Sequence, residues 1–526
     1  MLLHPIDWVI IVVYLVGCVV AGVWMKRYVR GVEDFAVAGR EMDLNLGIAS
    51  LAATEMGIVT MMYTAQMGFK YGFAGAAPGV LIAVAMFLVG VTGFVIGPMR
   101  DAGVITIPEL FEKRFGKRVR WLAGLVIVLG GVLNMGIFLR LGGEFLVHVT
   151  GMPPEYIEWV MTGLLAVVLL YTVLGGMLSV LVTDYIQFLV MGLGIVVTSV
   201  LVVWNIGWSD LISGLSGAYE TGAVVVSGVA EPGKNAAELK MGDPLNPVST
   251  GGLGWGWMTW QAMLALAVVT TWQTNIARVL SAKDSKTARG MYRRTAFYFV
   301  GRFALPGLWG AAAFVYFWSR GGLPDGVDDL TAMPAYLHTL LPVGVLGIVI
   351  AAMLAAEMST DSGYLLTWAT VIYNDLITPC LRRPLPQWAR LLILRSLVLL
   401  IGVFLVFYGL WYQLPGAAWD YLAVTGNIYL ASVFSLLVGA LYWRKANHCG
   451  AFAALILGAI GPISFLIVNA LVEEGSPYRI APEVAGLSAF ALAFAGMIFG
   501  SLLGGALGRG DPDSTPNAPP TRKEDR

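Results

Sequence analysis

The chain has 526 residues, of which 58% are hydrophobic and 13% charged, and its formal net charge is zero. A soluble chain carries about 25% charged residues, so this composition excludes a soluble globular protein and indicates one that lies mostly in lipid. The balanced charge gives no sign of a nucleic-acid partner. Three distant cysteines and four scattered histidines predict neither a disulfide framework nor a zinc site.

Thirteen apolar stretches are predicted to be membrane-spanning helices, because runs of about 20 apolar residues between short polar loops are typical of such helices. The first stretch lacks the charged start and cleavage site of a signal peptide, and we interpret it as a retained span. In chain order the predicted spans are 6–25, 44–69, 76–99, 121–149, 156–175, 181–206, 253–278, 296–318, 340–373, 388–410, 418–442, 450–473 and 484–508.

The distribution of Lys and Arg predicts the orientation. Alternate loops, together with the tail, hold 25 of the 33 basic residues, and basic loops face the cytoplasm. The N-terminus is therefore expected outside and the C-terminus in the cytoplasm of a cell (inner) membrane. The polar segment 509–526 is expected to be a disordered cytoplasmic tail. The basic loops are 26–43, 100–120, 278–295, 374–390 and 443–449.

Eight ionisable residues fall inside the predicted spans, where a central charge costs about 2.5 to 3.5 kcal/mol on insertion scales. Such residues normally face the protein interior or a path for ions or solutes. Two purely structural roles are the alternatives. An acid and a base four residues apart on one helix can pair with each other, and an arginine near a helix end can reach the membrane interface. The residues are Glu55, Arg140, Glu144, Asp184, Arg302, Glu357, Asp361 and Arg395.

Two of these acids lie in similar hexamers, AATEMG at 52–57 and AAEMST at 355–360. The later segment carries hydroxyls at Ser359, Thr360 and Ser362. A small-residue face can serve helix packing alone, but hydroxyls and free carbonyls also suit a hard cation such as sodium. Free carbonyls need a broken helix, as in the discontinuous helices of secondary transporters. We therefore predict a break at AATEMG.

Five motifs in this order resemble the sodium:solute symporter family, which includes proline, glucose, sialic acid and iodide transporters. The resemblance extends from about residue 7 to residue 460. The motifs are DFAVAGR at 34–40, ITIPELFEKRFGKRVR at 105–120, YTVLGGMLSVLVTDYIQ at 171–187, AAEMSTDS at 355–362 and WRKANHCGAF at 443–452.

The resemblance implies an all-α polytopic membrane protein with the leucine-transporter fold. Residues 1–508 would form one transporter domain, with 5+5 inverted repeats at about 44–206 and 253–442. It also implies a sodium site, formed by carbonyls of a broken second span and by a carbonyl and two hydroxyls of the ninth. On this sequence the ligands would be Ala53, Met56, Ala356, Ser359 and Thr360.

The family's sixth-span aspartate matches Asp184, which would line the ion exit path or a second ion site with Ser362. That second site also uses a serine where this chain has Gly363, so a second sodium is in doubt. No other cofactor is expected.

The family's solute sits between the repeats near the bilayer midplane, and Arg302 aligns with a basic residue of sugar-transporting members. Tryptophans at such positions can instead belong to interfacial belts. An acid at Glu55, where many relatives are uncharged, could favour an ammonium-bearing solute, assist the cation or take a proton. Candidate solute-binding residues are Glu55, Gln66, Arg140, Trp260, Gln261, Trp272, Gln273 and Tyr429.

The leading hypothesis is sodium-coupled symport of a small organic solute by alternating access. Proton coupling through Glu55 or Glu357, and a transporter-like sensor, are the alternatives. An enzyme is not expected, because no phosphate loop, nucleophile elbow or histidine metal motif stands in a suitable context. Solute identity, stoichiometry and oligomeric state stay open.

Overall fold

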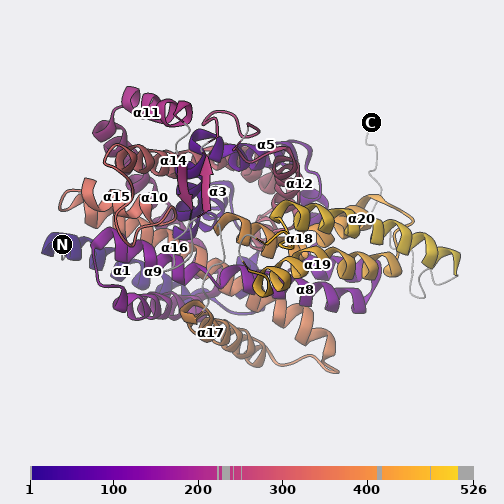
Figure 1. Ribbon diagram of the computed structural model, residues 1–526. Coiled ribbons are helices and arrows are strands. Elements are labelled where there is room, and N and C mark those ends of the chain that lie inside the picture. Colours follow the sequence, from indigo (N-terminus) through magenta and orange to yellow (C-terminus); the bar gives the residue numbers. More distant parts are fainter. Residues whose placement is uncertain are drawn as a thin grey trace, which may run out of the picture.

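The computed structural model describes residues 3–221, 224–227, 237–240, 242–249, 251–411, 418–473 and 476–507, and it is a bundle of helices (Figure 1). The predicted tail at 509–526 lies outside the described residues. The helices of the first half are α1 (Pro5–Trp24), α2 (Val32–Val37), α3 (Leu44–Thr54), α4 (Ile58–Tyr71), α5 (Ala77–Thr92), α6 (Ile96–Asp101), α7 (Ile107–Phe115), α8 (Lys117–Met135), α9 (Phe138–Thr150), α10 (Ile157–Ile206) and α11 (Trp208–Glu220).

The second half begins after a short antiparallel hairpin in the long predicted outer loop, and its last three helices pack together at one side of the bundle (Figure 1). The hairpin consists of β1 (Val224–Ser227) and β2 (Ala237–Lys240), and it pairs Val224 with Lys240. The helices are α12 (Trp255–Thr271), α13 (Gln273–Ser281), α14 (Ser285–Trp318), α15 (Ala332–Leu340), α16 (Val345–Val371), α17 (Gln387–Trp411), α18 (Ala418–Tyr442), α19 (His448–Leu471) and α20 (Pro482–Ala506).

The count of membrane spans differs from the prediction. Within the described ranges, 10 helical stretches are long and apolar enough to cross a membrane, so thirteen spans are not confirmed. The fifth and sixth predicted spans follow each other without a loop as α10, which consists of two helices that meet at a kink at Gly176 (φ 53°, ψ −144°). The second span is broken, and its second half continues through a short 3-10 turn into α5. The seventh predicted span is broken at Trp272 into α12 and α13, each of which is too short to count as a membrane-spanning helix.

The broken second and seventh spans are tied together at one end of the molecule. Met42, just before α3, and Ala282, just after α13, form a parallel bridge. The Met42 N–H donates to the Ser281 carbonyl at 3.1 Å, and the Lys283 N–H donates to the Met42 carbonyl at 3.1 Å. Asp284 then starts α14: its carboxylate accepts the Thr287 N–H, and this hydrogen bond lowers the pKa of Asp284. The same backbone hydrogen bonds therefore hold the ends of both broken spans together.

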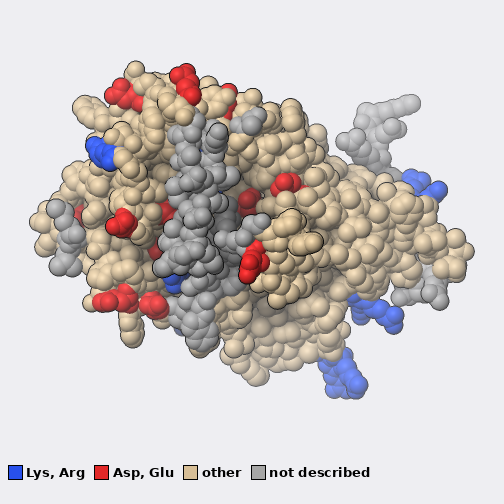
Figure 2. Space-filling view, viewed as in Figure 1, with Lys and Arg blue, Asp and Glu red and all other residues tan. Residues whose placement is uncertain are grey.

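Surface charge is uneven between the two ends of the helix bundle. On the face in Figure 2, Asp and Glu gather toward the end where the N-terminus lies, and Lys and Arg gather mainly toward the end where α20 finishes. This arrangement supports the orientation derived from the loops, with the N-terminus outside. The orientation itself stays a prediction.

Close packing of α4 against α14 depends on glycine. A methyl group built on Gly310 would overlap the carbonyl oxygen of Ala65, and one on Gly68 would overlap the carbonyl of Gly307. Backbone cannot yield as a flexible side chain can, so the two helices touch backbone to backbone.

Gly310→Ala is therefore expected to destabilise the protein by at least the ~1–3 kcal/mol typical of overpacking. Gly301→Ala is the matched control in the same helix, because the new methyl group would stand 3.9 Å from its nearest neighbour, Leu305 Cδ1. The measurement is the thermal unfolding temperature of both variants in detergent. Equal unfolding temperatures for the two variants would contradict the packing argument.

Candidate functional site

The predicted break at AATEMG is confirmed. Helix α3 ends at Thr54 and α4 begins at Ile58, because Gly57 adopts an extended conformation (φ −79°, ψ 167°) before α4 starts. Helix α16 lies directly against this break: Thr360 Oγ1 donates to the Thr54 carbonyl at 3.1 Å. A Cβ on Gly57 would stand 2.8 Å from Thr360 Oγ1. Any residue can adopt this extended backbone, so what requires glycine at this position is the close approach of α16.

The five sodium-ligand candidates lie on the two segments that meet here. Ala53 and Met56 belong to the end of α3 and to the break, and the other three belong to the middle of α16. All five are buried. In secondary transporters, carbonyls of unwound helix segments coordinate sodium ions or protons. That these residues bind sodium stays a prediction. They are Ala53, Met56, Ala356, Ser359 and Thr360.

Asp184 of α10 lies beside these candidate ligands. Its carboxylate is fully buried and accepts hydrogen bonds from Ser359 Oγ at 2.6 Å, Ser50 Oγ at 2.6 Å and Thr54 Oγ1 at 3.3 Å. Ser362 Oγ donates to the Ser359 carbonyl one turn back. The structure thus connects α3, α10 and α16 through one carboxylate, next to the break.

Arg278 of α13 completes this cluster, and sequence reasoning missed it. Its guanidinium is fully buried and lies 3.4 Å from Asp184 Oδ2. It also donates to Thr54 Oγ1 at 2.6 Å and to Ser50 Oγ at 3.3 Å. The sequence placed Arg278 at the start of a basic cytoplasmic loop, and no local signal separates a buried arginine from its exposed neighbours there.

The position of Arg278 explains Gly363. A Cβ on Gly363 would stand 2.8 Å from Arg278 Nη2, so a serine side chain there would compete with the guanidinium for space. The resemblance places a second ion site at Ser362, Gly363 and Asp184. In this chain the positive charge beside Asp184 comes from Arg278 itself.

A second helix break lies between α12 and α13 at Trp272 (φ −62°, ψ 108°). No glycine marks it, and the sequence did not predict it. The Trp272 indole N–H donates to Tyr364 OH at 3.1 Å, and its ring stacks on Tyr429 with centroids 5.7 Å apart. The two breaks therefore lie at matching positions, each at the start of one of the predicted repeats.

A buried cavity of about 80 Å³ lies between the two breaks. The polar and aromatic residues that line it include Glu55, Thr60, Tyr63, Asn134, Gln261, Trp272, Arg302, Tyr364 and Trp419.

A buried ion pair dominates the cavity. Arg302 Nη1 lies 2.9 Å from Glu55 Oε2, and Arg302 Nη2 donates to Thr60 Oγ1 and to Tyr63 OH, each at 3.1 Å. Among the described residues that line the cavity, four buried atoms have no hydrogen-bond partner: Glu55 Oε1, Arg302 Nε, Gln261 Nε2 and Trp419 Nε1. Buried polar atoms normally find partners, so these four atoms mark where a ligand can bind.

Three of the eight candidate solute residues line this cavity: Glu55, Gln261 and Trp272. Tyr429 stacks behind Trp272. Trp260 packs against Gly486 of α20 instead.

The remaining candidates have other partners. Gln66 donates to Asp329 Oδ1 at 3.2 Å and accepts the Ala418 N–H at 3.2 Å. Arg140 pairs with Glu144 at 3.0 Å. Gln273 Oε1 accepts the Ile107 N–H, and Arg395 donates to the Leu174 carbonyl. Sequence reasoning also missed Asn134, Tyr63 and Trp419, which line the cavity but are themselves uncharged, so the search for charges inside spans did not mark them.

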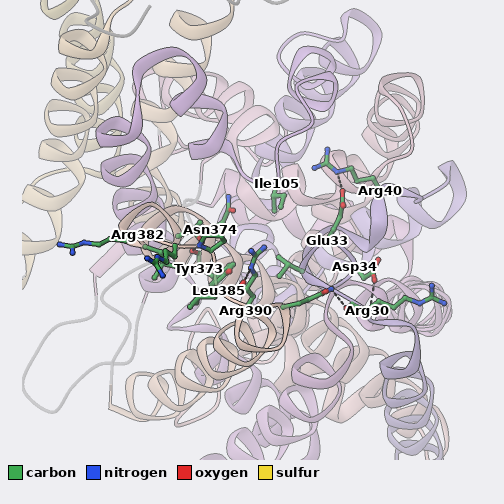
Figure 3. Close-up of a pocket in the computed structure, with 17 residues that line it drawn as sticks. Arg30, Glu33, Asp34, Arg40, Ile105, Tyr373, Asn374, Arg382, Leu385 and Arg390 are labelled. Atoms are coloured by element: carbon green, nitrogen blue, oxygen red, sulfur yellow. Dashed lines mark hydrogen bonds and ion pairs between the residues drawn. The ribbon is translucent and has the colours of Figure 1, made fainter. Parts of the chain in front are cut away.

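A separate, wider pocket of about 880 Å³ opens on the surface where three predicted cytoplasmic loops meet. Figure 3 shows side chains from segments far apart in the sequence around it, with Arg30 and Arg382 extending in opposite directions and Glu33 paired to Arg40 at 2.8 Å. None of its lining residues is shared with the buried cavity. This pocket is therefore distinct from the candidate ion and solute sites.

Comparison with known proteins gives consistent matches over most of the chain. The model of the sodium:solute symporter family matches residues 35–458. A sodium/glucose cotransporter of Vibrio parahaemolyticus is 27% identical over 90% of this chain and 86% of its own length. A sodium/myo-inositol cotransporter 2 of Oryctolagus cuniculus is 27% identical over 90% of this chain and 71% of its own. The solved structure of a Na⁺-coupled sialic acid symporter superposes with a TM-score of 0.78, 19% identity, and coverage of 95% of this chain and 98% of that one.

Proposed function

The chain belongs to the sodium:solute symporter family, and on that premise we propose that it uses the sodium gradient to take up a small, uncharged, polyhydroxylated solute. The single observation that carries the sodium part is the contact between the α3–α4 break and α16, where Thr360 bonds the Thr54 carbonyl. Carbonyls of the break and two hydroxyls meet there, and unwound backbone carbonyls coordinate sodium in secondary transporters. The chain is a multi-pass membrane protein of a transporter family, and no catalytic role is proposed.

Sodium coupling follows from the position of the site. A cation held between the break and α16 would fix α3 and α4 relative to the rest of the bundle. The same break carries Glu55 into the cavity, so sodium would also organise the solute site. Because binding free energies are reciprocal, the solute must then tighten sodium by the same factor.

The solute class is inferred from the cavity. Glu55 and Arg302 neutralise each other at 2.9 Å, so neither is available as the sole counter-charge for an ionic solute, and an ammonium group is not specifically favoured. The unpartnered atoms of the cavity are one carboxylate oxygen and three N–H donors, a set that suits the hydroxyl groups of a solute. Two relatives are named for glucose and myo-inositol, which supports this class.

Ligand-induced stabilisation tests the proposal. We expect hexoses or cyclitols to raise the unfolding temperature of the purified protein in sodium but not in choline, because ligands that bind the native state stabilise it. Amino acids, amines and carboxylates form the comparison set. Stabilisation by one of those classes instead, with no response to sugars or polyols, would overturn the solute assignment.

We predict that one sodium ion accompanies each solute. Arg278 supplies a fixed positive charge to Asp184 at 3.4 Å, and it occupies the space that a side chain at residue 363 would need. The sodium dependence of uptake in proteoliposomes should therefore have a Hill coefficient of about 1. Paired isotope fluxes of sodium and solute provide the direct measurement, and a flux ratio of about two would contradict a single site.

Proton coupling and a sensor role are the other candidate functions. Glu55 is committed to Arg302, which argues against it as a free proton carrier. Uptake driven by a pH gradient in sodium-free buffer would favour proton coupling. Solute binding without any net uptake would favour a sensor.

A further inference from the structure

The wide pocket of about 880 Å³ on the predicted cytoplasmic side carries an excess of positive charge, and we call it the arginine pocket. Five arginines and two acids line it. They come from the chain in and around α2, from the connection between α16 and α17, and from the first turn of α17. Small-molecule sites have volumes of about 300–1,000 Å³, so the arginine pocket is large enough for a ligand. Its charged residues are Arg30, Glu33, Asp34, Arg40, Arg382, Arg383 and Arg390.

The two acids of the arginine pocket already have partners. Glu33 pairs with Arg40 at 2.8 Å, and Arg40 also donates to the Gly103 carbonyl at 2.8 Å. Asp34 Oδ2 accepts the backbone N–H of Arg30 at 2.9 Å, and this bond does not involve the Arg30 side chain. Five arginines against two acids leave the pocket a surplus of three positive charges.

Three arginines of the pocket are not engaged. Within the described part of the chain, no ion pair or hydrogen bond involves the guanidinium groups of Arg30, Arg382 and Arg383, and all three residues are exposed. Arg30 and Arg382 extend in opposite directions (Figure 3), so their long side chains are free to turn toward a bound anion. Arg390 is half-buried, and its Nε donates to the Leu385 carbonyl at 2.7 Å. This bond holds the Arg390 guanidinium at the first turn of α17.

Membrane topology alone does not explain this arrangement. Basic loops are expected on the cytoplasmic side of any multi-pass protein, but that role requires no cavity among the basic residues. In the neighbouring basic loop, Lys113 and Arg114 bond backbone carbonyls of Ala102 and Arg444 instead, at 2.6 and 2.8 Å. The arginine pocket combines a cavity with guanidinium groups that have no partner among the described residues.

Helix α17 places the arginine pocket at the level of lipid head groups. Trp388, next to Gln387 of the pocket lining, is 69% exposed, and tryptophan is typical of the membrane interface. A row of exposed apolar residues continues along the same helix, as expected for a surface that contacts lipid chains. A lipid that lies along this row brings its head group to the pocket. The row consists of Leu392, Leu399, Leu400, Val403, Phe404 and Phe407.

We propose that the arginine pocket binds a phosphate-bearing anion, and that the lipid-facing side of α17 favours an anionic lipid head group as its source. Guanidinium groups bond phosphate oxygens in pairs, and basic pockets between helices on the cytoplasmic side bind phosphorylated head groups. The N-terminus of α17 adds free N–H groups and a favourable dipole. Tyr373 and Asn374, in the turn that follows α16, also line the pocket. A bound anion therefore connects the cytoplasmic ends of α16 and α17.

Titrations of the purified full chain in detergent micelles test the proposal. Phosphatidylglycerol is added in one series, and phosphatidylcholine, which has a phosphate but no net charge, in another. Sodium phosphate is compared with sodium chloride at equal sodium concentration. The readout is the unfolding temperature, which rises with the concentration of a ligand that binds the native state. We expect phosphatidylglycerol to raise the unfolding temperature of the wild type at lower concentration than phosphatidylcholine does.

Matched double variants assign the binding to the pocket. Arg382→Gln with Arg383→Gln removes two exposed charges of the pocket, whereas Arg293→Gln with Arg294→Gln removes two adjacent exposed arginines of α14 that do not line it. One basic residue near an anionic head group contributes about fivefold in affinity. The pocket variant should therefore bind about 25-fold more weakly, and the control should bind like the wild type. Arg30→Gln should weaken binding by about fivefold.

The outcomes separate the two sources of phosphate and do not depend on sodium binding. A phosphatidylglycerol response that falls in the pocket variant but not in the control assigns a lipid head group, and the same pattern with sodium phosphate assigns a soluble phosphate. Equal responses of the two double variants to both probes would overturn the proposal, because any basic surface would then attract the anion. No response of the wild type to either probe would overturn it as well. If the pocket variant unfolds without ligand, the comparison of Arg30→Gln with the wild type decides in the same way.

Discussion

Replacing Ser359 and Thr360 together by alanine is expected to abolish sodium-stimulated uptake. The two hydroxyls are the only side-chain donors in the proposed sodium set, and they hold α16 to its neighbours through Asp184 and the Thr54 carbonyl. A hydrogen bond to a charged group contributes about 1.5 to 3 kcal/mol. If each hydroxyl contributes a similar amount to sodium, the double variant loses at least 100-fold in sodium affinity. The measurement is initial uptake in proteoliposomes against external sodium.

A matched double variant on the same helix separates ion binding from folding. Thr367→Ala with Thr370→Ala also removes two buried hydroxyls of α16, but these lie about two turns beyond the sodium candidates. Thr367 bonds only the Gly363 carbonyl of its own helix. The control should keep sodium-stimulated uptake. If uptake by the Ser359/Thr360 variant is still stimulated by sodium, the proposed sodium site is wrong.

The sequence predicted the parts of the site that local chemistry marks. An acid and a glycine inside an apolar run indicated the α3–α4 break, and hydroxyls at Ser359 and Thr360 indicated the face of α16 that meets it. The geometry confirms the break and this contact. The alternation of basic loops predicted an orientation that the surface charge supports. These features are readable because each depends on residue type at one place in the chain.

Features that depend on long-range packing could not be predicted in this way. Arg278 looks like any basic residue at a helix end, and only the approach of α3 and α10 makes it a buried partner of Asp184. Trp272 breaks a helix without glycine or proline, because its indole is held by Tyr364 and Tyr429 from other helices. The sequence divided α10 close to its kink at Gly176, but it did not predict that the two helices follow each other without a loop. Hydropathy marks apolar segments but does not say where the backbone turns.

The two breaks suggest how ion and solute sites act together. Glu55 belongs to the first break and Trp272 to the second, and both line the same small cavity. Any movement of α3 and α4 relative to α12 and α13 must change the cavity. An outer contact, in which Lys70 of α4 pairs with Asp329 at 2.9 Å, connects that movement to the predicted outer side. Solute access and sodium binding therefore depend on the same set of half-helices.

Removal of the Arg302 charge is expected to cost more stability than removal of the whole ion pair. Arg302→Gln leaves Glu55 buried without its cation, and breaking a buried pair in this way costs about 3–5 kcal/mol. In the double variant Glu55→Gln with Arg302→Gln, both charges are gone, and much of that stability should return. Uptake should stay lost in both variants, because a hydroxylated solute loses its charge-assisted hydrogen bonds. Unfolding temperature and sodium-driven uptake are the two readouts.

The Arg140–Glu144 pair provides the control for this comparison. It is also an acid–base pair within a predicted span, at 3.0 Å, but its side chains are 33% and 22% exposed. Exposed pairs contribute about 0–1 kcal/mol, so Arg140→Gln should change the unfolding temperature little and leave uptake intact. Full uptake in the double variant at Glu55 and Arg302 would show that the pair only supports the fold. Loss of uptake in Arg140→Gln with an unchanged unfolding temperature would move the solute site toward α9.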